Sequence, residues 1–538
     1  MKKPIVSLRL LLAVLWAAIL YLPSAVWAAE GDGTAEVVIF HTNDIHARVN
    51  AGDDGGATIG LAQMAAAVKA VKEKNPNTLW MDAGDTLHGM PRITISRGAN
   101  MVPLLNAAGL DILAPGNHDY NYGSDRLEAL AKEFHCAVLS ANTVRRIPRD
   151  PASPEREFLF RPYQIRTLPS GVTLGIFGLT TPETAFKTNP KNVTEVDFLN
   201  PVDSARAMIS MLRPQCDVVV AVMHMGIDKS SEFTSERIAK EAPGIDLIVD
   251  GHSHTALPDG MRVGNTLIVQ TGAHGYKLGC VKLQVNRHHL TGATARLLSA
   301  KDIQALAKVP DPAVAQALSQ MEKDNTRLFG EVIAHSDRSL TSDPLILRQS
   351  EAALGNLCAD AFREETGAEI GVINGGGMRN DLPAGDVTRG DIMAIFPFGN
   401  TIQVAKLSGN ILHEMLEHSV FNSPESFGGF LHVSGLTFSF DPEQPPGHRV
   451  YDIEVGDAPL DPNRTYTMAA TDFLFIGGDG YFMLKPLPIV GEFDTAETLL
   501  VEYLNKTGME DIEPGRITVA PRPAEETDST EDEERDAA

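Results

Sequence analysis

Short aliphatic runs that alternate with helical stretches are the feature that most restricts the fold of this chain. Between them, residues Leu61–Lys74 and Asp125–Phe134 place apolar side chains at helical spacing. Strands that alternate with helices predict an α/β domain over the first 300 residues or so. The strand-like runs are AEVVIF (35–40), TLWMD (78–82), DILAP (111–115), VTLGIFGL (172–179), DVVVAVM (217–223), DLIVD (246–250) and TLIVQ (266–270).

The second half of the chain repeats this kind of pattern after an interruption. At 538 residues the chain is too long for a single hydrophobic core. Residues 301–330 have the pattern of a helical connector, broken by Pro310 and Pro312. Helical patterns near 353–365 and 408–420 and a strand pattern at 368–373 follow. The sequence therefore predicts two α/β domains joined by a helical linker.

The two ends of the chain differ in composition from the body. Residues 1–28 combine bases at positions 2, 3 and 9 with an apolar run at 10–22, the pattern of a cleavable signal peptide. An uncleaved membrane anchor is the alternative, although the run is short for a membrane span. We therefore expect a periplasmic or secreted protein without stable membrane insertion after cleavage. Residues 521–538 are rich in acids, so we expect a disordered tail.

Net charge and cysteine usage exclude some classes of function. The formal net charge is −24, which argues against binding of a nucleic acid polymer because such binding needs a basic surface. The four cysteines are far apart and form no CxxC pair, so we expect none of them to bind metal. One disulfide is possible in an exported protein, but the aliphatic surroundings of Cys216 and Cys280 suit buried free thiols at least as well.

Aspartate, asparagine or histidine follows five of the predicted strands. Because such sheets bind ligands at the carboxyl ends of their strands, we expect these side chains to meet at one edge. Carboxylate, imidazole and amide donors without thiolates suit Zn²⁺, Mn²⁺ or Fe²⁺. Seven candidates exceed the needs of one four-coordinate ion, which predicts two ions roughly 3.5–4 Å apart with one bridging carboxylate. The candidates are Asp44, His46, Asp85, Asn117, His224, His252 and His254.

The motifs around these residues occur in a familiar order. TNDIHAR, DAGDTLHG, PGNHDYNYG, VVVAVMHMG and DGHSHT resemble the motifs of the calcineurin-like metallophosphoesterase domain. With the second domain and the export signal, the chain resembles the bacterial 5′-nucleotidases, whose family includes periplasmic UDP-sugar hydrolase and animal ecto-5′-nucleotidase. The resemblance implies an α/β (α+β) protein with a metallophosphoesterase β-sandwich flanked by helices at 36–300, a helical linker at 301–330 and an α/β nucleotide-binding domain at 331–520.

The resemblance also implies which residue does what at the metal centre. Asp44, His46 and His254 match the ligands of one divalent ion, and Asn117, His224 and His252 match those of the other. Asp85 matches the bridging carboxylate. The ions implied are Zn, Mn, Co or Fe.

A histidine beside the metal ligands matches a catalytic group of the family. His118 corresponds to the residue that stabilises the transition state or protonates the leaving group. The family usually has an acid three residues further on, where this chain has Asn121, while Asp119 is the nearest carboxylate in sequence. We expect Asn121 or Asp119 to orient the imidazole, and an amide stabilises an imidazolium less than a carboxylate does.

The second domain contains matches to the family's nucleotide site. Two aromatics correspond to the rings that enclose the base, which suits any base because every base has a π-face. A carboxylate can accept hydrogen bonds from both ribose hydroxyls. The predicted substrate-binding residues are Arg348, Asn374, Gly376, Arg379, Phe398, Asn400, Phe473 and Asp479.

Together these residues predict hydrolysis of a nucleoside 5′-monophosphate by attack of a metal-activated water. A UDP-sugar, NAD or a 2′,3′-cyclic nucleotide is an alternative substrate on the same fold, and a thiosulfate ester is a further one. A solute-binding protein without catalysis is the alternative from another class, but it leaves the metal ligands without a purpose. The sequence does not distinguish the preferred nucleotide, the metal or the oligomeric state.

Overall fold

The computed structural model describes residues 34–522 except 148–156, 230, 510–511 and 513. The predicted signal peptide and all but the first two residues of the predicted acidic tail lie outside the described residues. Within the described part of the chain, no helix has the length and apolar character needed to cross a membrane.

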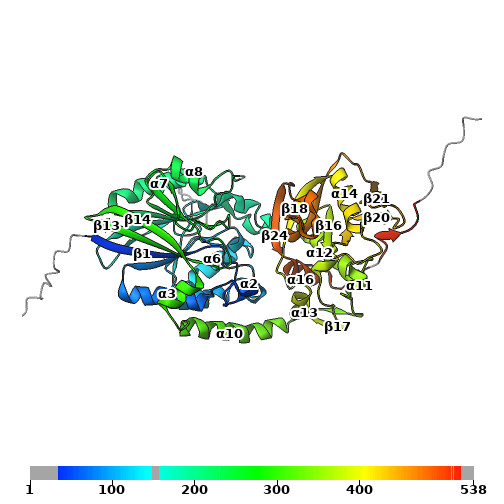
Figure 1. Ribbon diagram of the computed structural model, residues 1–538, viewed down its shortest axis with the longest axis horizontal. Helices are drawn as coiled ribbons and strands as arrows, with labels where there is room; N and C mark the ends of the chain where they lie inside the picture. The colour runs from blue at the N-terminus through cyan, green and yellow to red at the C-terminus, as the bar shows by residue number, and fades with distance from the viewer. Residues whose placement is uncertain (1–33, 148–156, 230, 510–511, 513, 523–538) are drawn as a thin grey trace, which may run out of the picture.

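The first domain contains two six-stranded sheets (Figure 1). In each sheet, neighbouring central strands are parallel; antiparallel strands lie on one side of the first sheet and at both edges of the second. The first sheet has the order β14 (His289–Leu298), β13 (Leu278–Asn286), β1 (Thr34–Thr42), β2 (Thr78–Asp82), β3 (Ile112–Leu113) and β4 (Ala137–Val138). The second has the order β11 (Met261–Val263), β12 (Thr266–Val269), β10 (Leu247–Val249), β9 (Val218–His224), β7 (Thr173–Thr180) and β6 (Tyr163–Thr167).

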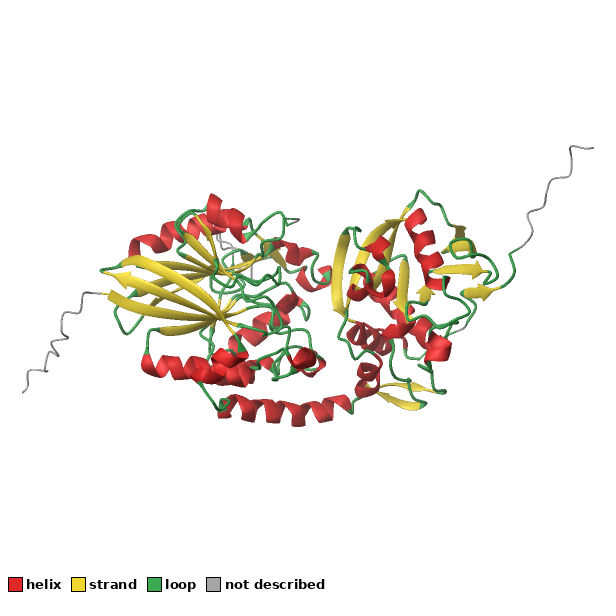
Figure 2. Ribbon diagram, viewed as in Figure 1, coloured by secondary structure: helices red, strands yellow, loops and turns green. Residues whose placement is uncertain are grey.

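The two sheets pack face to face and helices cover their outer faces (Figure 2). Successive residues of a strand point to opposite faces. Val37 and Ile39 of β1 therefore join the core between the sheets, whereas Val38 and Phe40 join the core beneath the helices. This β-sandwich flanked by helices agrees with the predicted fold. A small pair, β5 (Thr143–Arg145) and β8 (Val196–Phe198), forms a separate sheet.

The helices of the first domain follow local sequence signals. Helix α3 buries one apolar face and has Lys72 and Lys74 in its last turn, where cations stabilise the helix dipole. In α7, the Asn200 side chain accepts from the N–H groups of two residues in the first turn. The helices are α2 (Asp53–Gly56), α3 (Leu61–Lys74), α4 (Pro91–Thr94), α5 (Met101–Ala108), α6 (Ser124–Glu133), α7 (Pro201–Leu212), α8 (Ser235–Glu241) and α9 (Ala300–Leu306).

The linker is the long helix α10 (Pro312–Phe329), which runs along one side of the first domain and ends at the second (Figure 1). Asp311 caps this helix by accepting from the Val314 N–H, and Pro312 occupies its first turn, where a missing N–H costs nothing. Pro312 thus starts a helix, so the predicted break lies before it. Helix α10 contacts α3 and α5 of the first domain and α13 (Arg389–Ile395) of the second.

The second domain is built on a five-stranded mixed sheet with helices on both sides (Figure 2). Its order is β19 (Leu431–Ser434), β16 (Ile370–Asn374), β23 (Thr465–Thr471), β18 (Thr401–Ser408) and β24 (Ile489–Thr495). Two smaller sheets are β22 (Ala458–Pro459), β21 (Val450–Val455), β20 (Leu436–Phe440) and β25 (Ile517–Val519), and the pair β15 (Val332–Ser336) and β17 (Gly385–Thr388). The remaining helices are α11 (Pro344–Leu347), α12 (Ala353–Thr366), α14 (Gly409–Val420), α15 (Asp472–Phe475) and α16 (Ala496–Thr507).

All four cysteines are buried and none is in a disulfide. Burial raises the pKa of the Cys136 thiol to about 12 and also raises the pKa values of Cys216, Cys280 and Cys358. The expectation of free, buried thiols is therefore confirmed over that of a disulfide.

Strand β24, at the edge of the second domain's main sheet, faces the first domain. The Glu492 N–H donates to the Phe186 carbonyl at 3.0 Å. His88 Nε2 lies 2.6 Å from Asp494 Oδ1, and the His88 side chain is 1% exposed. Burial acts to lower the pKa of His88, but the adjacent Asp494 carboxylate outweighs burial and raises it. A buried ion pair thus connects the two domains.

We expect His88→Ala to lower the free energy of unfolding by about 3–5 kcal/mol, because Asp494 would be left without its partner. His88→Gln is the matched control, since its amide can donate to Asp494 without charge. A raised pKa in the folded state stabilises the fold most at a pH below the unfolded value, and this contribution is lost as the pH rises through the folded value. Urea unfolding at several pH values should therefore show a difference between wild type and His88→Gln that shrinks as pH rises. A difference that grows with pH would contradict the ion pair.

Candidate metal centre

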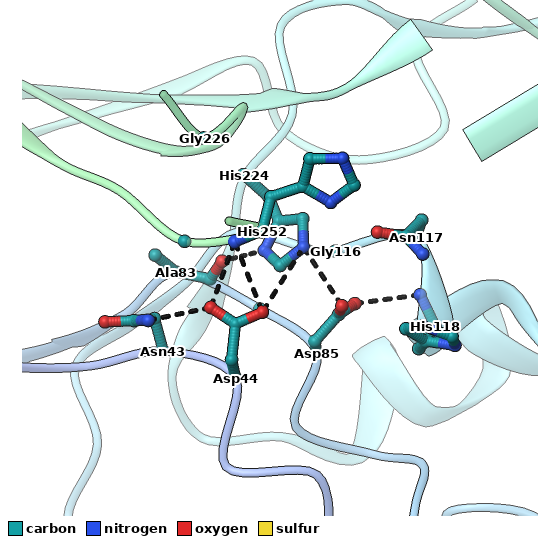
Figure 3. Close-up of polar contacts among 12 residues, drawn as sticks. Asn43, Asp44, Ala83, Asp85, Gly116, Asn117, His118, His224, Gly226 and His252 are labelled. Atoms are coloured by element: carbon teal, nitrogen blue, oxygen red, sulfur yellow. Dashed lines mark hydrogen bonds and ion pairs between the residues drawn. The ribbon is translucent and has the colours of Figure 1, made fainter. Parts of the chain in front are cut away.

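The seven predicted ligands come together at one edge of the sandwich, and Figure 3 labels five of them: Asp44, Asp85, Asn117, His224 and His252. Parallel strands place their carboxyl ends on the same side. Each ligand lies at or just after such an end: Asp44 and His46 follow β1, Asp85 follows β2, Asn117 follows β3, His224 ends β9, and His252 and His254 follow β10.

Six of these residues form two groups in which the potential ligand atoms lie within 4.8 Å of one another. The first group is Asp44, His46 and His254, and the second is Asp85, His224 and His252. Within the second group, Asp85 Oδ2 is 3.0 Å from His224 Nε2, and between the groups Asp44 Oδ1 is 3.8 Å from the same nitrogen. The two groups therefore share one site.

Several ligand atoms face one another or lack the partner that a buried polar atom normally has. Asn117 Oδ1 is buried without a hydrogen-bond partner among the described residues. The groups near His224 Nε2 are the carboxylates of two other predicted ligands, Asp85 and Asp44, and the Nε2 atoms of His46 and His254 face each other at 3.0 Å. Ligand atoms that face one another, with no thiolate among them, fit divalent cations of the Zn²⁺ or Mn²⁺ type. The residues present therefore fit two metal ions.

The backbone around the site is strained in the way expected of a functional site. Five of the seven ligands have a positive φ, which non-glycine residues rarely adopt: Asp44, His46, Asp85, His252 and His254. A Cβ atom at Gly116 would lie 2.1 Å from Asp85 Oδ1, so this position allows only glycine. The glycine beside Asn117 therefore makes room for the carboxylate of Asp85.

Hydrogen bonds outside the centre fix the orientation of the ligands. His224 Nδ1 donates to the Ala83 carbonyl at 2.6 Å, which leaves Nε2 as the coordinating nitrogen (Figure 3). Asp44 Oδ2 accepts from Asn43 Nδ2 at 2.7 Å and from the His252 N–H at 3.0 Å. The ligand set is thus held in place by first-domain residues.

The pKa values of Asp85 and His224 depend on the charges of neighbouring residues in the site. Burial acts to raise the pKa of Asp85, but the imidazoles of His224 and His118 outweigh it and lower the pKa well below the usual range. Burial likewise acts to lower the pKa of His224, whereas Asp85 and Asp44 raise it to about 10. The Asp85 carboxylate therefore stays ionised and attracts cations.

His118 lies next to this centre on a 3₁₀ turn, η1 (His118–Tyr120). Its backbone N–H donates to Asp85 Oδ1 at 2.8 Å. Asn121 Oδ1 accepts from Thr188 Oγ1 at 2.7 Å, so the Asn121 amide nitrogen faces His118 Nδ1, 3.4 Å away. An N–H donor there requires an unprotonated Nδ1, which leaves the proton on Nε2. Burial lowers the pKa of His118 to about 4, so the ring is a neutral donor.

Asp119 has a different task from the one predicted. Its two carboxylate oxygens accept from the backbone N–H groups of Asp85, Thr86, Leu87 and Gly116, at 2.8–3.0 Å. These bonds hold together the loops after β2 and β3, and each carboxylate oxygen accepts two of them. Asp119 therefore supports the backbone of the metal-binding loops, and of these two predicted residues only Asn121 contacts the His118 ring.

A cavity of about 420 Å³ opens at the centre and is lined by both domains. Phe398 and Asn400 line it together with the metal ligands, and the Phe398 side chain is exposed. Several residues of this wall, including His88 and His274, are not among the site residues predicted from sequence. His88 belongs to the DAGDTLHG motif and had a signal that could be read, whereas His274 follows a different strand, β12, and had none.

The other predicted substrate residues are spread over the second domain. Arg348 and Arg379 line a separate cavity of about 430 Å³, although the Arg379 guanidinium lies 5.6 Å from the Phe398 ring. Asn374 Nδ2 donates to Asp479 Oδ2 at 2.8 Å. The Gly376 N–H donates to the Gly428 carbonyl, and Phe473 is partly buried against the core. The structure thus places Phe398 and Asn400, but not this whole set, in the cavity with the metal ligands.

Comparison with known proteins agrees with both halves of this description. Residues 37–256 match the calcineurin-like phosphoesterase family and residues 332–486 match the 5′-nucleotidase C-terminal domain. The chain is 28% identical to the human 5′-nucleotidase over 87% of each protein. It is 28% identical to the trifunctional nucleotide phosphoesterase YfkN of Bacillus subtilis, of which it covers 32%, over 84% of its own length.

A solved structure supports the same relationship. The 5′-nucleotidase precursor of Thermus thermophilus matches with a TM-score of 0.52 and 28% identity, over 91% of this chain and 100% of that one. The two matched families together cover most of the described residues, in the order that the fold shows. The chain therefore belongs to the metal-dependent phosphoesterases that combine a calcineurin-like domain with a 5′-nucleotidase C-terminal domain.

Proposed function

We propose that the protein is an exported 5′-nucleotidase, which hydrolyses nucleoside 5′-monophosphates to nucleoside and phosphate. The observation that supports this most is the cavity of about 420 Å³, whose wall combines metal-ligand residues with Phe398 and Asn400 of the second domain. A nucleotide presents a phosphoryl group to the metal side and a base to an aromatic surface. The human and Thermus thermophilus relatives, both named 5′-nucleotidases, support the same substrate class.

In this proposal Asp44, His46 and His254 hold one ion, Asn117, His224 and His252 hold the other, and Asp85 contacts both. Bound there, two divalent ions supply positive charge to the phosphoryl oxygens and lower the pKa of the attacking water. His118 donates a hydrogen bond from its Nε2–H to the leaving 5′-oxygen and so stabilises the negative charge that develops there. Asn121 keeps the ring oriented and holds Nδ1 free of a proton, as its position 3.4 Å from that atom supports.

The second domain binds the nucleoside in this proposal. Phe398 and Phe473 stack on the base, and Asp479 accepts from the ribose hydroxyls. The bond from Asn374 to Asp479 supports this role, since it fixes the carboxylate. Arg348 and Arg379 supply positive charge, Asn400 contacts the base, and Gly376 allows close approach of the backbone. Export is proposed from the signal-peptide pattern of residues 1–28.

The direct test is release of inorganic phosphate from AMP by the purified protein, with added Mn²⁺, Zn²⁺ or Co²⁺ and with a chelator. We expect release that depends on metal and stops with the chelator. UDP-glucose, NAD, 2′,3′-cyclic nucleotides and bis(p-nitrophenyl) phosphate form the comparison panel, since YfkN is named a trifunctional nucleotide phosphoesterase. Binding of AMP without any phosphate release would indicate a non-catalytic binding protein and exclude the proposal.

The proposed base clamp predicts a selective loss. We expect Phe398→Ala or Phe473→Ala to raise the KM for AMP roughly 5- to 150-fold, because stacking contributes about 1–3 kcal/mol per base. Hydrolysis of p-nitrophenyl phosphate should change far less, because this substrate has no base. Phe158→Ala, which removes a partly exposed ring of the first domain, is the control. Equal losses on both substrates would mean that the rings support the fold and do not bind the base.

A further inference from the structure

A short turn beside the second metal-binding group and the lysine just after it contact two of the predicted ligands. The turn is η2 (Pro182–Ala185), and it follows strand β7. Thr181 caps it by accepting from the Glu183 N–H at 3.3 Å, and Thr184 Oγ1 donates to the Thr181 carbonyl at 2.7 Å. Thr181 and Thr184 are fully buried, so the turn is a fixed part of the first domain.

The side chain of Glu183 contacts the imidazole of His252. Glu183 Oε2 lies 3.0 Å from His252 Nε2 and 3.0 Å from Lys187 Nζ. Because a carboxylate is an acceptor, His252 Nε2 carries the proton and Nδ1 is left bare. The ring nitrogen available to the group with Asp85 and His224 is then Nδ1.

Lys187, two residues after the turn, contacts the amide ligand. Asn117 Nδ2 donates to the Lys187 carbonyl at 2.9 Å, which fixes the orientation of the amide. Asn117 Oδ1, the opposite atom of that amide, is buried without a hydrogen-bond partner in the described structure. Two ligands that follow different strands, β3 and β10, are thus held by Glu183 in the turn and by Lys187 just after it, whose N–H donates to the Glu183 carbonyl at 2.7 Å.

We propose that Glu183 is a positioning residue for the second metal-binding group, which it serves by holding His252 with Nδ1 unprotonated and turned toward the centre. Lys187 completes the arrangement: its carbonyl orients Asn117, and its ammonium group is neutralised by Glu183. Without Glu183, this cation would remain 3.3 Å from His252 Nε2 and would repel a metal ion. The inference rests on the ligand assignment in the proposed function, which the experiment tests separately.

The experiment measures binding of Mn²⁺ to the metal-stripped full-length protein by isothermal titration and by the bound-metal content after gel filtration. Wild type is expected to bind two ions. Glu183→Ala should weaken binding of one ion about 10- to 100-fold and leave the other unchanged, since outer hydrogen-bond partners of metal ligands typically have this effect. Glu183→Gln should lose less, because its amide oxygen can still accept from Nε2. Glu195→Gln, an exposed residue with the same change of charge, is the matched control.

The same substitution made in a His46→Ala protein identifies which ion is affected. His46→Ala removes a ligand of the first group, so the ion that remains belongs to the second group. Adding Glu183→Ala to His46→Ala should weaken this remaining ion by the same 10- to 100-fold. Unchanged Mn²⁺ binding in both Glu183→Ala proteins would overturn the inference about Glu183 while leaving the proposed function intact. Wild type that binds fewer than two ions would instead refute the ligand assignment. Circular dichroism of each variant confirms folding.

Discussion

Asp85→Ala is expected to reduce kcat/KM for AMP by about three orders of magnitude or more while the protein still folds. Asp85 belongs to the second ligand group, lies 3.0 Å from His224 Nε2 and accepts from the His118 N–H at 2.8 Å. In the proposed site its removal would take a ligand from both ions, and it also removes the positioning bond from His118. Loss of about 4 kcal/mol of transition-state stabilisation, a modest share of what metal ions supply, corresponds to about 10³-fold in rate.

Metal analysis decides how this result is interpreted. We expect the Asp85→Ala protein to retain fewer than two ions after gel filtration, with a circular dichroism spectrum like that of wild type. Asp203→Ala, at an exposed position of α7, is the control for loss of an aspartate. Full activity with two bound ions would rule out Asp85 as the residue shared by both ions.

His118→Ala is expected to lower kcat for AMP about 10²–10⁴-fold while both ions remain bound, the range for loss of a catalytic hydrogen-bond or proton donor. The ring is not a ligand in either group, and the structure gives it a proton on Nε2. The loss should be smallest for p-nitrophenyl phosphate, because a phenolate needs little stabilisation as it leaves. Loss of metal together with activity would place His118 among the ligands and disprove its role as a donor to the leaving oxygen.

The neighbour of His118 provides an independent pH test. Asn121→Asp replaces an N–H donor by a carboxylate, which accepts from Nδ1 and stabilises the imidazolium. Burial lowers the pKa of His118 to about 4 in the wild-type protein, and the pKa should rise in the variant. Below this raised pKa the ring of the variant is an imidazolium, a stronger donor to the leaving oxygen, so the basic limb of the kcat profile should move to higher pH. Asp119→Asn should instead reduce stability, because Asp119 holds four backbone N–H groups.

The aliphatic strands and the residues after them could be predicted from sequence for a simple physical reason. A strand that is buried on both faces, such as β9 (VVVAVMH), contains hardly any polar residues until it ends, so the run and its terminus are both visible. Parallel strands then bring their ends together, which is why Asp44 and His224 could be expected in one site although 180 residues separate them.

Other features have no such signal. Strand β14 alternates partly exposed residues and carries no continuous aliphatic run, so the hairpin at 278–298 was not predicted. Asp119 was predicted from its position in sequence, but the direction of its side chain depends on two loops that meet only in three dimensions. Glu183 and the ion pair between His88 and Asp494 depend on contacts across 69 and 406 residues, which no local pattern encodes.

The four buried thiols have a practical consequence for measuring motion between the domains. Thiol reagents attack the thiolate, and burial both excludes these reagents and keeps the native cysteines protonated. A cysteine introduced on the surface of each domain, for example at Asp203 and at Glu331, would therefore react with a maleimide dye long before the native four. The natural sequence thus needs no cysteine removal before paired dyes are attached to report the distance between the domains during turnover.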